Sequence, residues 1–194
     1  MRAGQIRLGC QGLARRLERL GKLALLAQIV AVAHLLARGS APIAFVGRIE
    51  TSAIGRARFD GYRDALLAHG QTLDPVLVWD ISEGYRADAG YRAASEALAN
   101  GLRFRAVLAA SDELALGCMA AAADRGLAMP DDIAFVGFGG LRWGVFSRPS
   151  MTTVSLDVDA VARAVGDIFK TRPDGPAPSS RRVIPTKLVL RQSA

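Results

Sequence analysis

The sequence predicts an α/β fold, a doubly wound and mainly parallel sheet with helices on both faces. Four short runs are apolar throughout, without the alternation of a half-exposed strand, and this is typical of strands buried on both faces. Segments with helical spacing of their apolar residues separate these runs. The chain has 194 residues, of which 51% are hydrophobic and 22% charged, so it is large enough to bury such a core.

The predicted strands and helices alternate up to residue 138. The strands are residues 42–47, 76–79, 106–110 and 133–138, and the helices between them are residues 56–69, 87–100 and 111–125. A glycine follows each helix, at Gly70, Gly101 and Gly126, where a left-handed residue ends a helix at low cost. Ser111 or Asp112 is placed to cap the third helix. Binding sites of such sheets lie at the carboxyl ends of the strands, so the loops that follow them are the place to look.

The remaining chain interrupts this alternation. A loop with several glycines runs to residue 150, residues 157–170 have helical spacing, residues 171–180 are rich in proline and serine, and residues 183–190 form a last strand. We interpret this part as a crossover connection followed by a segment that returns to the sheet. The stretch "TTVSLDVDAVARAVG" (residues 152–166) resembles the first helix of a DNA-binding helix-turn-helix, but the segment after it cannot form the second helix, so we reject that interpretation.

The first 32 residues form a basic and apolar leader that we separate from a domain at residues 33–194. Residues 1–22 hold six basic side chains against one acidic one, which is +5 of the formal net charge of +7. Since the rest is nearly balanced, a general DNA-binding face is not indicated. Leu13, Leu17 and Leu20 suit one stripe of a solvated amphipathic helix. The apolar run that follows fits a secretory signal or, as we prefer, a buried helix through Leu23, Leu26, Val30 and Leu35 that ends at Gly39.

The side chains needed for common catalytic or metal sites are missing from the sequence. There is no G-x-S-x-G motif, and the only histidines are His34 and His69. The two cysteines, Cys10 and Cys118, do not have metal-ligand spacing. We therefore predict that the chain is not an enzyme and has no catalytic residues, no metal and no cofactor.

Several linked motifs resemble one known family. The stretches "HLLARGSAPIAFVG", "RARFDGYRDALLAHG", "AVLAASDELALGCMAAAADRGLAMPDDIAFVGF", "RPSMTTV" and "VIPTKLVLRQS" have the order and spacing of the sensor portion of lactose-repressor/galactose-repressor (LacI/GalR) type transcription regulators. The match covers residues 34–193. Periplasmic sugar-binding proteins share this fold.

The resemblance implies a two-lobed, type I periplasmic-binding-protein-like fold, of which this chain holds mostly the C-terminal lobe. It also implies a small effector, sugar-like or nucleobase-like, that binds between the lobes, and a cytoplasmic homodimer. We expect no helix-turn-helix, no direct DNA contact and no membrane contact from this chain. An apolar helix face formed by Leu114, Cys118, Met119 and Ala122 fits either a dimer contact or core packing. The alternative is an exported periplasmic sugar-binding protein of a transport system.

The resemblance also assigns five effector-binding positions: Arg58, Tyr85, Ser111, Asp112 and Gly139. Arg58 corresponds to an arginine that donates to effector hydroxyls or a carboxylate, a task that suits its planar head. Tyr85 corresponds to a stacking aromatic, and Ser111 to a polar contact. Other interpretations stay open: Arg58 on an exposed helix surface, Tyr85 as an ordinary loop residue and Asp112 as a helix cap. Where the family has a carboxylate pair this chain has Gly139 and its neighbouring glycine, so ordinary sugar recognition is in question.

Overall fold

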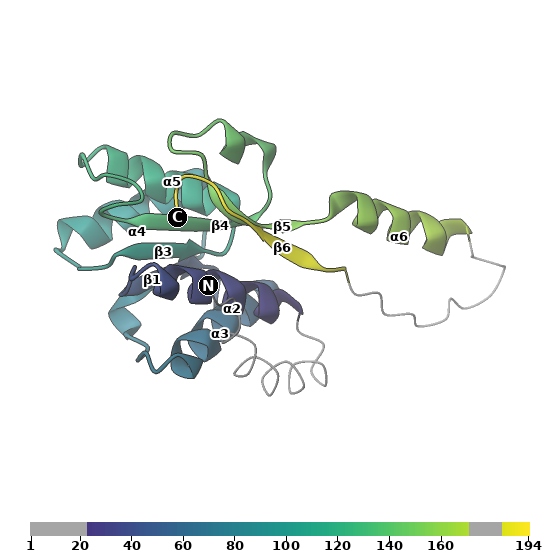
Figure 1. Cartoon of the computed structure of the whole chain (residues 1–194), viewed down its shortest axis with the longest axis horizontal. Coiled ribbons are helices and arrows are strands. Elements are labelled where there is room, and N and C mark those ends of the chain that lie inside the picture. Colours follow the sequence, from purple (N-terminus) through teal and green to yellow (C-terminus); the bar gives the residue numbers. More distant parts are fainter. Residues whose placement is uncertain (1–22, 171–183) are drawn as a thin grey trace, which may run out of the picture.

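Six strands form one sheet in the order β2-β1-β3-β4-β5-β6 in the computed structural model, which describes residues 23–170 and 184–194 (Figure 1). All neighbouring strands pair in parallel except β5 and β6, which are antiparallel. The strands are β1 (Ile43–Gly47), β2 (Val78–Asp80), β3 (Ala106–Ala109), β4 (Ala134–Gly139), β5 (Thr152–Leu156) and β6 (Thr186–Val189). The helices are α2 (Leu23–Ala37), α3 (Ala53–Ala68), α4 (Ala87–Ala99), α5 (Asp112–Ala123) and α6 (Val158–Lys170), with the short 3-10 helices η1 (Pro75–Leu77) and η2 (Arg142–Val145).

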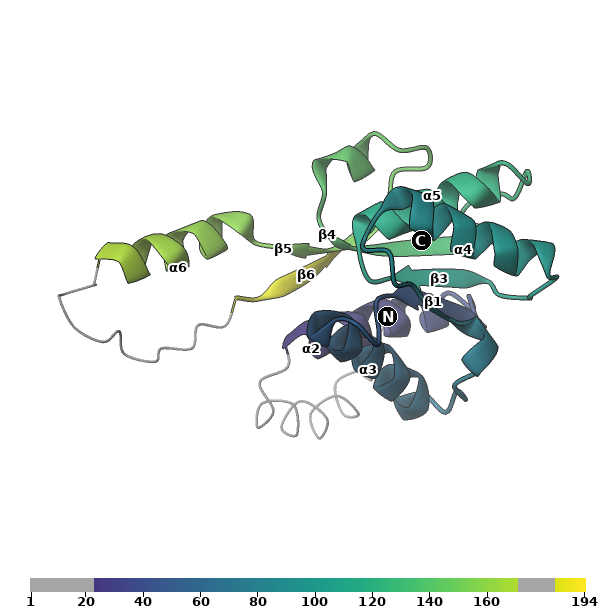
Figure 2. The ribbon, with the colours of Figure 1, turned by 180° about the vertical axis from the view of Figure 1, so that it is seen from behind.

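Helices cover both faces of the sheet. α2 and α3 pack together on one face and α4 and α5 on the other, as Figures 1 and 2 show from opposite sides. β1 and β3 lie between the two layers, and every residue of both strands is buried. The continuous apolar strands follow from this burial on both faces. The predicted doubly wound, mainly parallel α/β fold is confirmed.

α4 and α5 approach each other closely because glycines line their contact. A Cβ atom at Gly117 would lie 1.9 Å from the carbonyl oxygen of Ala87, and one at Gly90 would lie 2.3 Å from that of Leu114. The Cys118 thiol donates to the carbonyl oxygen of Gly90 at 3.3 Å, and burial raises its pKa to about 12. The predicted apolar stripe is buried here: Leu114, Cys118, Met119 and Ala122. Core packing therefore explains that stripe, and it is not a surface for a second copy.

Two of the strands differ from the sequence prediction. Residues 75–77 form η1, so β2 begins only at Val78. The cause is local, since the Asp74 carboxylate accepts from the backbone N–H of Val76 at 3.0 Å and Pro75 occupies the first helical position. The second difference is β5, a strand that was not predicted from the sequence. It runs directly into α6, so residues 152–166 are a strand followed by a helix and not one continuous helix. Most of the segment on which the rejection of a helix-turn-helix rested, residues 171–180, lies outside the described residues.

The predicted buried helix before Gly39 is confirmed for residues 28–37. Ile29, Val32 and Leu35 are buried, whereas Val30, predicted on the same stripe, is 51% exposed because it points to the outer side of α2. Gly39 has a φ of +73°, and the N–H groups of Gly39 and its successor donate to carbonyl oxygens of the last turn.

Some predictions fall outside the described residues. They concern residues 1–22, with the leucine stripe and most of the excess positive charge, the side chains of Leu23 and Leu26, and residues 171–183. The boundary drawn between residues 32 and 33 lies inside α2. Within residues 23–170 and 184–194, none of the helices has both the length and the hydropathy that crossing a bilayer requires.

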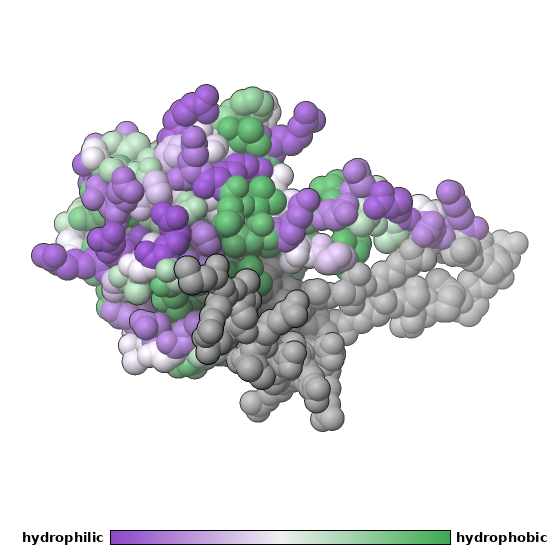
Figure 3. Space-filling view, viewed as in Figure 1, coloured by the Kyte–Doolittle hydropathy of each residue, from purple (hydrophilic) through white to green (hydrophobic). Residues whose placement is uncertain are grey.

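Residues 156–170, called the arm below, extend away from the rest of the sheet (Figure 1). The arm consists of the end of β5 and the whole of α6. Its valines are exposed, with Val158 at 68% and Val165 at 47%. Apolar side chains are visible along this helix in Figure 3. The arm is therefore a projecting amphipathic helix, unlike the layered body.

Candidate functional site

The predicted site residues come together at one end of the sheet. β1, β3 and β4 are mutually parallel, so the loops after their carboxyl ends lie side by side. Arg58 reaches this edge from α3, where its Nη1 donates to the carbonyl oxygen of Ala110, the residue after β3, at 2.5 Å. The Arg58 guanidinium lies over the Phe138 ring of β4, 3.9 Å from the ring centroid, and 5.8 Å from the centroid of Tyr85. Arg58 thus contacts the loop after β3, the end of β4 and the loop before α4.

The Arg58 guanidinium is a half-buried cation that forms no ion pair with a carboxylate of residues 23–170 or 184–194. Burial removes the guanidinium from solvent and lowers its pKa. The electrostatic influence of Tyr85 and Asp112 partly offsets this decrease. Its Nε is buried and has no hydrogen-bond partner, and among the described residues no carboxylate forms an ion pair with it. An arginine carries five N–H donors in a planar fork. On Arg58 one of them donates to the carbonyl oxygen of Ala110, and a side-chain hydrogen bond with Tyr85 also supports the charged form. The Nε–H is closed to solvent, so only unused N–H groups on the two terminal nitrogens are candidates for a ligand contact.

Tyr85 lies in the loop before α4 and faces the start of α3. Its hydroxyl donates to the Ser52 Oγ at 3.5 Å, and that oxygen also accepts from the Gly55 N–H at 3.1 Å as the N-cap of α3. A Cβ at Gly55 would lie 2.9 Å from the Tyr85 hydroxyl and 1.7 Å from the carbonyl oxygen of Arg48. Glycine at this position therefore allows the β1–α3 loop, α3 and Tyr85 to meet.

The loop after β1 is fixed by Asp80 at the end of β2. The Asp80 carboxylate accepts from the backbone N–H groups of Ile49 at 2.6 Å and Glu50 at 3.2 Å. The sequence analysis did not single out this residue. A carboxylate directly after the apolar run at residues 76–79 was the available signal, because such a residue lies at the edge where the loops meet.

Ser111 is the N-cap of α5, since its Oγ accepts from the Leu114 N–H at 3.2 Å. Its hydroxyl hydrogen remains available to a ligand at the same edge. The cap is therefore Ser111 and not Asp112, which the sequence left as alternatives.

Asp112 is fully buried and turned into the fold. Its Oδ1 accepts from the Thr153 hydroxyl and its Oδ2 from the Leu141 N–H, each at 2.5 Å. Burial raises the pKa of this carboxyl, and the hydrogen bonds from Thr153 and the loop backbone partly offset the rise. Asp112 therefore ties the start of α5 to β5 and to the loop after β4. A direct effector contact by Asp112 remains a prediction.

Gly139 and Gly140 shape the loop that Asp112 holds. Their φ angles are +135° and +78°, a region that glycine adopts without strain. A Cβ at Gly140 would lie 2.4 Å from the Ser155 Oγ, and one at Gly139 would lie 3.6 Å from the Asp112 Oδ2. A carboxylate pair would therefore require a different loop, and this edge presents the Arg58 donors without an acidic partner.

The described residues show no arrangement for a metal. No group of three or more His, Cys, Asp or Glu side chains within residues 23–170 and 184–194 is placed to hold an ion. The edge around Arg58 offers hydrogen-bond donors, two aromatic rings and one hydroxyl. This set can bind and orient a small polar molecule, and none of its members is a histidine or a free carboxylate that would exchange protons near neutral pH.

The sequence profile of the periplasmic binding protein-like domain matches residues 32–194. The catabolite control protein A of Priestia megaterium is 33% identical over 168 residues, which cover 84% of this chain and 49% of that protein. The structure of a putative LacI-family transcriptional regulator from Sanguibacter keddieii has a TM-score of 0.76 at 31% identity and covers 89% of this chain and 64% of that one. A LacI-family regulator from Lactobacillus casei with bound sucrose has a TM-score of 0.76 at 25% identity, with coverages of 88% and 63%.

The chain spans about half the length of the curated relatives it matches. Two of these relatives, AscG of Escherichia coli and MalR of Clostridium butyricum, are HTH-type transcriptional regulators. This favours a regulator over the exported sugar-binding protein that the sequence left as an alternative.

Proposed function

Because the chain belongs to the periplasmic binding protein-like domain family, in the form of LacI-family sensor domains, we propose that it senses a small, sugar-like effector for a transcription regulator. The observation that carries this proposal is the Arg58 guanidinium. It lies over the Phe138 ring, donates to the Ala110 carbonyl oxygen, is close to Tyr85 and has no ion pair within the part of the chain that the structure describes. A half-buried cation with free donors is costly to keep and gains most from a polar ligand.

Each side chain at the edge has a distinct task in the proposed complex. Arg58 donates its unused N–H groups to effector hydroxyls or a carboxylate, and Tyr85 stacks on the ring of the effector. The Ser111 hydroxyl donates a further hydrogen bond. Gly139 lets the loop after β4 pass close to the effector, and Asp112 positions this loop through the Leu141 N–H. The process is binding without chemistry, so the protein is not an enzyme.

The signal is a shift between two arrangements of the regulator. An effector that binds one arrangement more tightly shifts the population toward that arrangement. The size of the shift is limited by the difference between the binding free energies of the effector for the two arrangements. We propose that the regulator works in the cytoplasm as a homodimer and that DNA is contacted outside the described residues. In those residues the stretch that resembled a DNA reader is a strand followed by α6.

Thermal-shift screening of pentoses, hexoses and nucleobases tests the proposal. We expect at least one compound to raise the melting temperature, and Arg58→Ala to abolish the shift. Arg56→Ala is the matched control, because Arg56 is an exposed arginine of the same helix. A shift that Arg58→Ala leaves unchanged would refute the role of Arg58, and the same loss in both variants would show that the effect is not specific to the site.

A further inference from the structure

The side-chain groups that remain unused at the edge around Arg58 are hydrogen-bond donors. On Arg58, N–H groups of the terminal nitrogens are left after the contacts with Ala110 and Tyr85. The Ser111 Oγ already accepts from the Leu114 N–H, so its hydroxyl hydrogen is what remains for a ligand. The site therefore offers an effector several donors and few acceptors.

Two carboxylates that β2 and α5 bring to this edge serve the fold. Asp112 is fully buried, and its two oxygens accept from the Thr153 hydroxyl and the Leu141 N–H. The two oxygens of Asp80 each accept from a backbone N–H of the β1–α3 loop. An effector hydroxyl that donated to either carboxylate would compete with these contacts.

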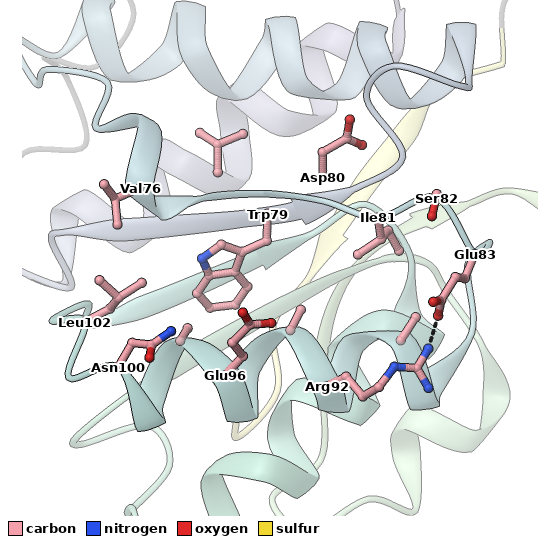
Figure 4. Close-up of a pocket in the computed structure, with 14 residues that line it drawn as sticks. Val76, Trp79, Asp80, Ile81, Ser82, Glu83, Arg92, Glu96, Asn100 and Leu102 are labelled. Carbon is pink, nitrogen blue, oxygen red and sulfur yellow. Dashed lines mark hydrogen bonds and ion pairs between the residues drawn. The ribbon is translucent and has the colours of Figure 1, made fainter.

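The acidic side chains on both sides of Tyr85 are paired with arginines. Glu83 forms an ion pair with Arg92, which Figure 4 shows, and Asp88 contacts Arg86 at 2.9 Å and Arg92 at 3.2 Å. These carboxylates are therefore balanced by cations of their own loop and helix, and not by Arg58.

The other residues at this edge leave the charge of Arg58 unbalanced. β4 ends at Gly139 and the chain continues with Gly140, so this strand end supplies no side chain to the site. Glu50 and Glu113 are exposed, so water and salt screen their carboxylates from Arg58. Within residues 23–170 and 184–194, the half-buried guanidinium thus has no carboxylate in an ion pair with it.

We propose that the effector is a hydroxylated compound with an anionic group, a carboxylate or a phosphate, and that this group binds Arg58. This inference rests on the proposed function and names the chemical class of its effector. An anionic group accepts hydrogen bonds and donates none, so it matches a site whose unused groups are donors. Two of its oxygens fit the planar fork of a guanidinium in charge-assisted hydrogen bonds. The Ser111 hydroxyl donates to a further oxygen of the compound.

A neutral sugar fits the same place less well. Each of its hydroxyls can accept from Arg58, but each also carries a hydrogen that needs an acceptor, and this edge offers few. It would also leave the half-buried guanidinium without an opposite charge. We therefore expect a neutral sugar to bind at least about tenfold more weakly than the corresponding acid, because hydrogen bonds to charged groups are the stronger ones. A cationic compound is excluded, since it would be repelled by Arg58.

Isothermal titration calorimetry of the wild-type chain at neutral pH tests the inference without any substitution. The compounds are D-glucose and D-galactose, the uronate of each and the 6-phosphate of each, with acetate and inorganic phosphate as simple anions. We expect at least one sugar acid or sugar phosphate to bind at least about tenfold more tightly than its neutral parent and than the simple anions.

Variants at Arg58 identify the group that recognises the anion. Arg58→Gln removes the charge and should weaken binding of the acid at least about tenfold, while binding of the neutral parent changes much less. Arg58→Lys keeps the charge without the fork and should restore part of the affinity. Arg56→Gln is the matched control on the exposed side of the same helix. Urea midpoints of all variants verify that they fold.

The outcomes separate this inference from the proposed function. Binding that depends on Arg58, but in which a neutral sugar equals or exceeds its acid and its phosphate, overturns the inference and leaves the proposed function standing. Simple anions that bind as tightly as the sugar acids also overturn it. Acid binding that Arg58→Gln leaves unchanged contradicts both. If no acid or phosphate binds, the inference is overturned, and the thermal-shift screen of neutral sugars and nucleobases decides the proposed function separately.

Discussion

The helix α5 of the body and the helix α6 of the arm are of nearly equal length but have opposite surroundings. α5 is apolar almost all round, and most of its residues are buried against α4 and the sheet. α6 is the more amphipathic of the two by sequence, yet Val158, Val161 and Val165 are exposed. Amphipathic spacing therefore predicts that a helix forms and which face is apolar, but not whether another element covers that face. The contribution of each helix to the free energy of unfolding should therefore depend on how much of the helix is buried, and not on how regular its amphipathic spacing is.

The largest contrast is expected between core and arm truncations. Leu114→Ala removes a fully buried side chain of α5 and should lower the free energy of unfolding by about 3 kcal/mol, from lost burial and the cavity left behind. Val165→Ala on α6 should change it by less than about 0.5 kcal/mol, because that side chain is already largely in solvent. Urea unfolding at equilibrium measures both. Similar losses would mean that α6 is packed in solution and that the contrast fails.

A smaller loss in the free energy of unfolding is expected when a buried polar contact of the layered body is removed. Asp112→Asn leaves one acceptor oxygen where the carboxyl group has two, so either the Thr153 hydroxyl or the Leu141 N–H loses its buried partner, and this should cost about 2 kcal/mol. Asp159→Asn, on the exposed side of α6, is the control and should be neutral.

The cost of Asp112→Asn should also depend on pH. Burial raises the folded-state pKa of Asp112, so its contribution to stability is fully present below the ordinary aspartate pKa of about 3.9 and declines as pH rises through the folded value. The stability advantage of the wild type over Asp112→Asn should therefore shrink from pH 4 upward. Unfolding midpoints at several pH values measure it, and an advantage that grows with pH would contradict the burial of this carboxyl.

The same residues show what the sequence could and could not predict. The apolar runs, the glycines after helices and Ser111 as a cap are local signals, and they predicted most elements to within a few residues. β5 was missed because Thr152 and Thr153 are polar, and their burial depends on partners about forty residues away in the sequence. A period-based prediction has no access to such pairs.

Some residues of the candidate site were also predicted from the sequence, and others were not. Family resemblance singled out Arg58 and Tyr85, and the fold places both at one edge. Phe138 under the guanidinium was not predicted, because an apolar residue ending a strand is also an ordinary core residue. Asp80 was missed for a similar reason, since its contact with the β1–α3 loop spans two separate strands. Contacts between loops of different strands are set by topology, which a single sequence leaves implicit.

Identical glycine substitutions on the two helices give the smallest and most discriminating comparison. Gly117→Ala on α5 would place a Cβ 1.9 Å from a backbone carbonyl of α4, which cannot turn aside as a side chain could, so we expect a loss of about 2 kcal/mol. Gly166 lies inside α6 with no atom near the position of a Cβ, so Gly166→Ala should stabilise that helix by about 0.5 kcal/mol through reduced backbone entropy of the unfolded chain. Hydrogen exchange of the α6 amides measures the second effect, which should appear as slower exchange confined to the arm. Opposite signs for one substitution would show that burial, and not helix propensity, separates the two regions, whereas destabilisation by Gly166→Ala would reveal a surface packed against α6.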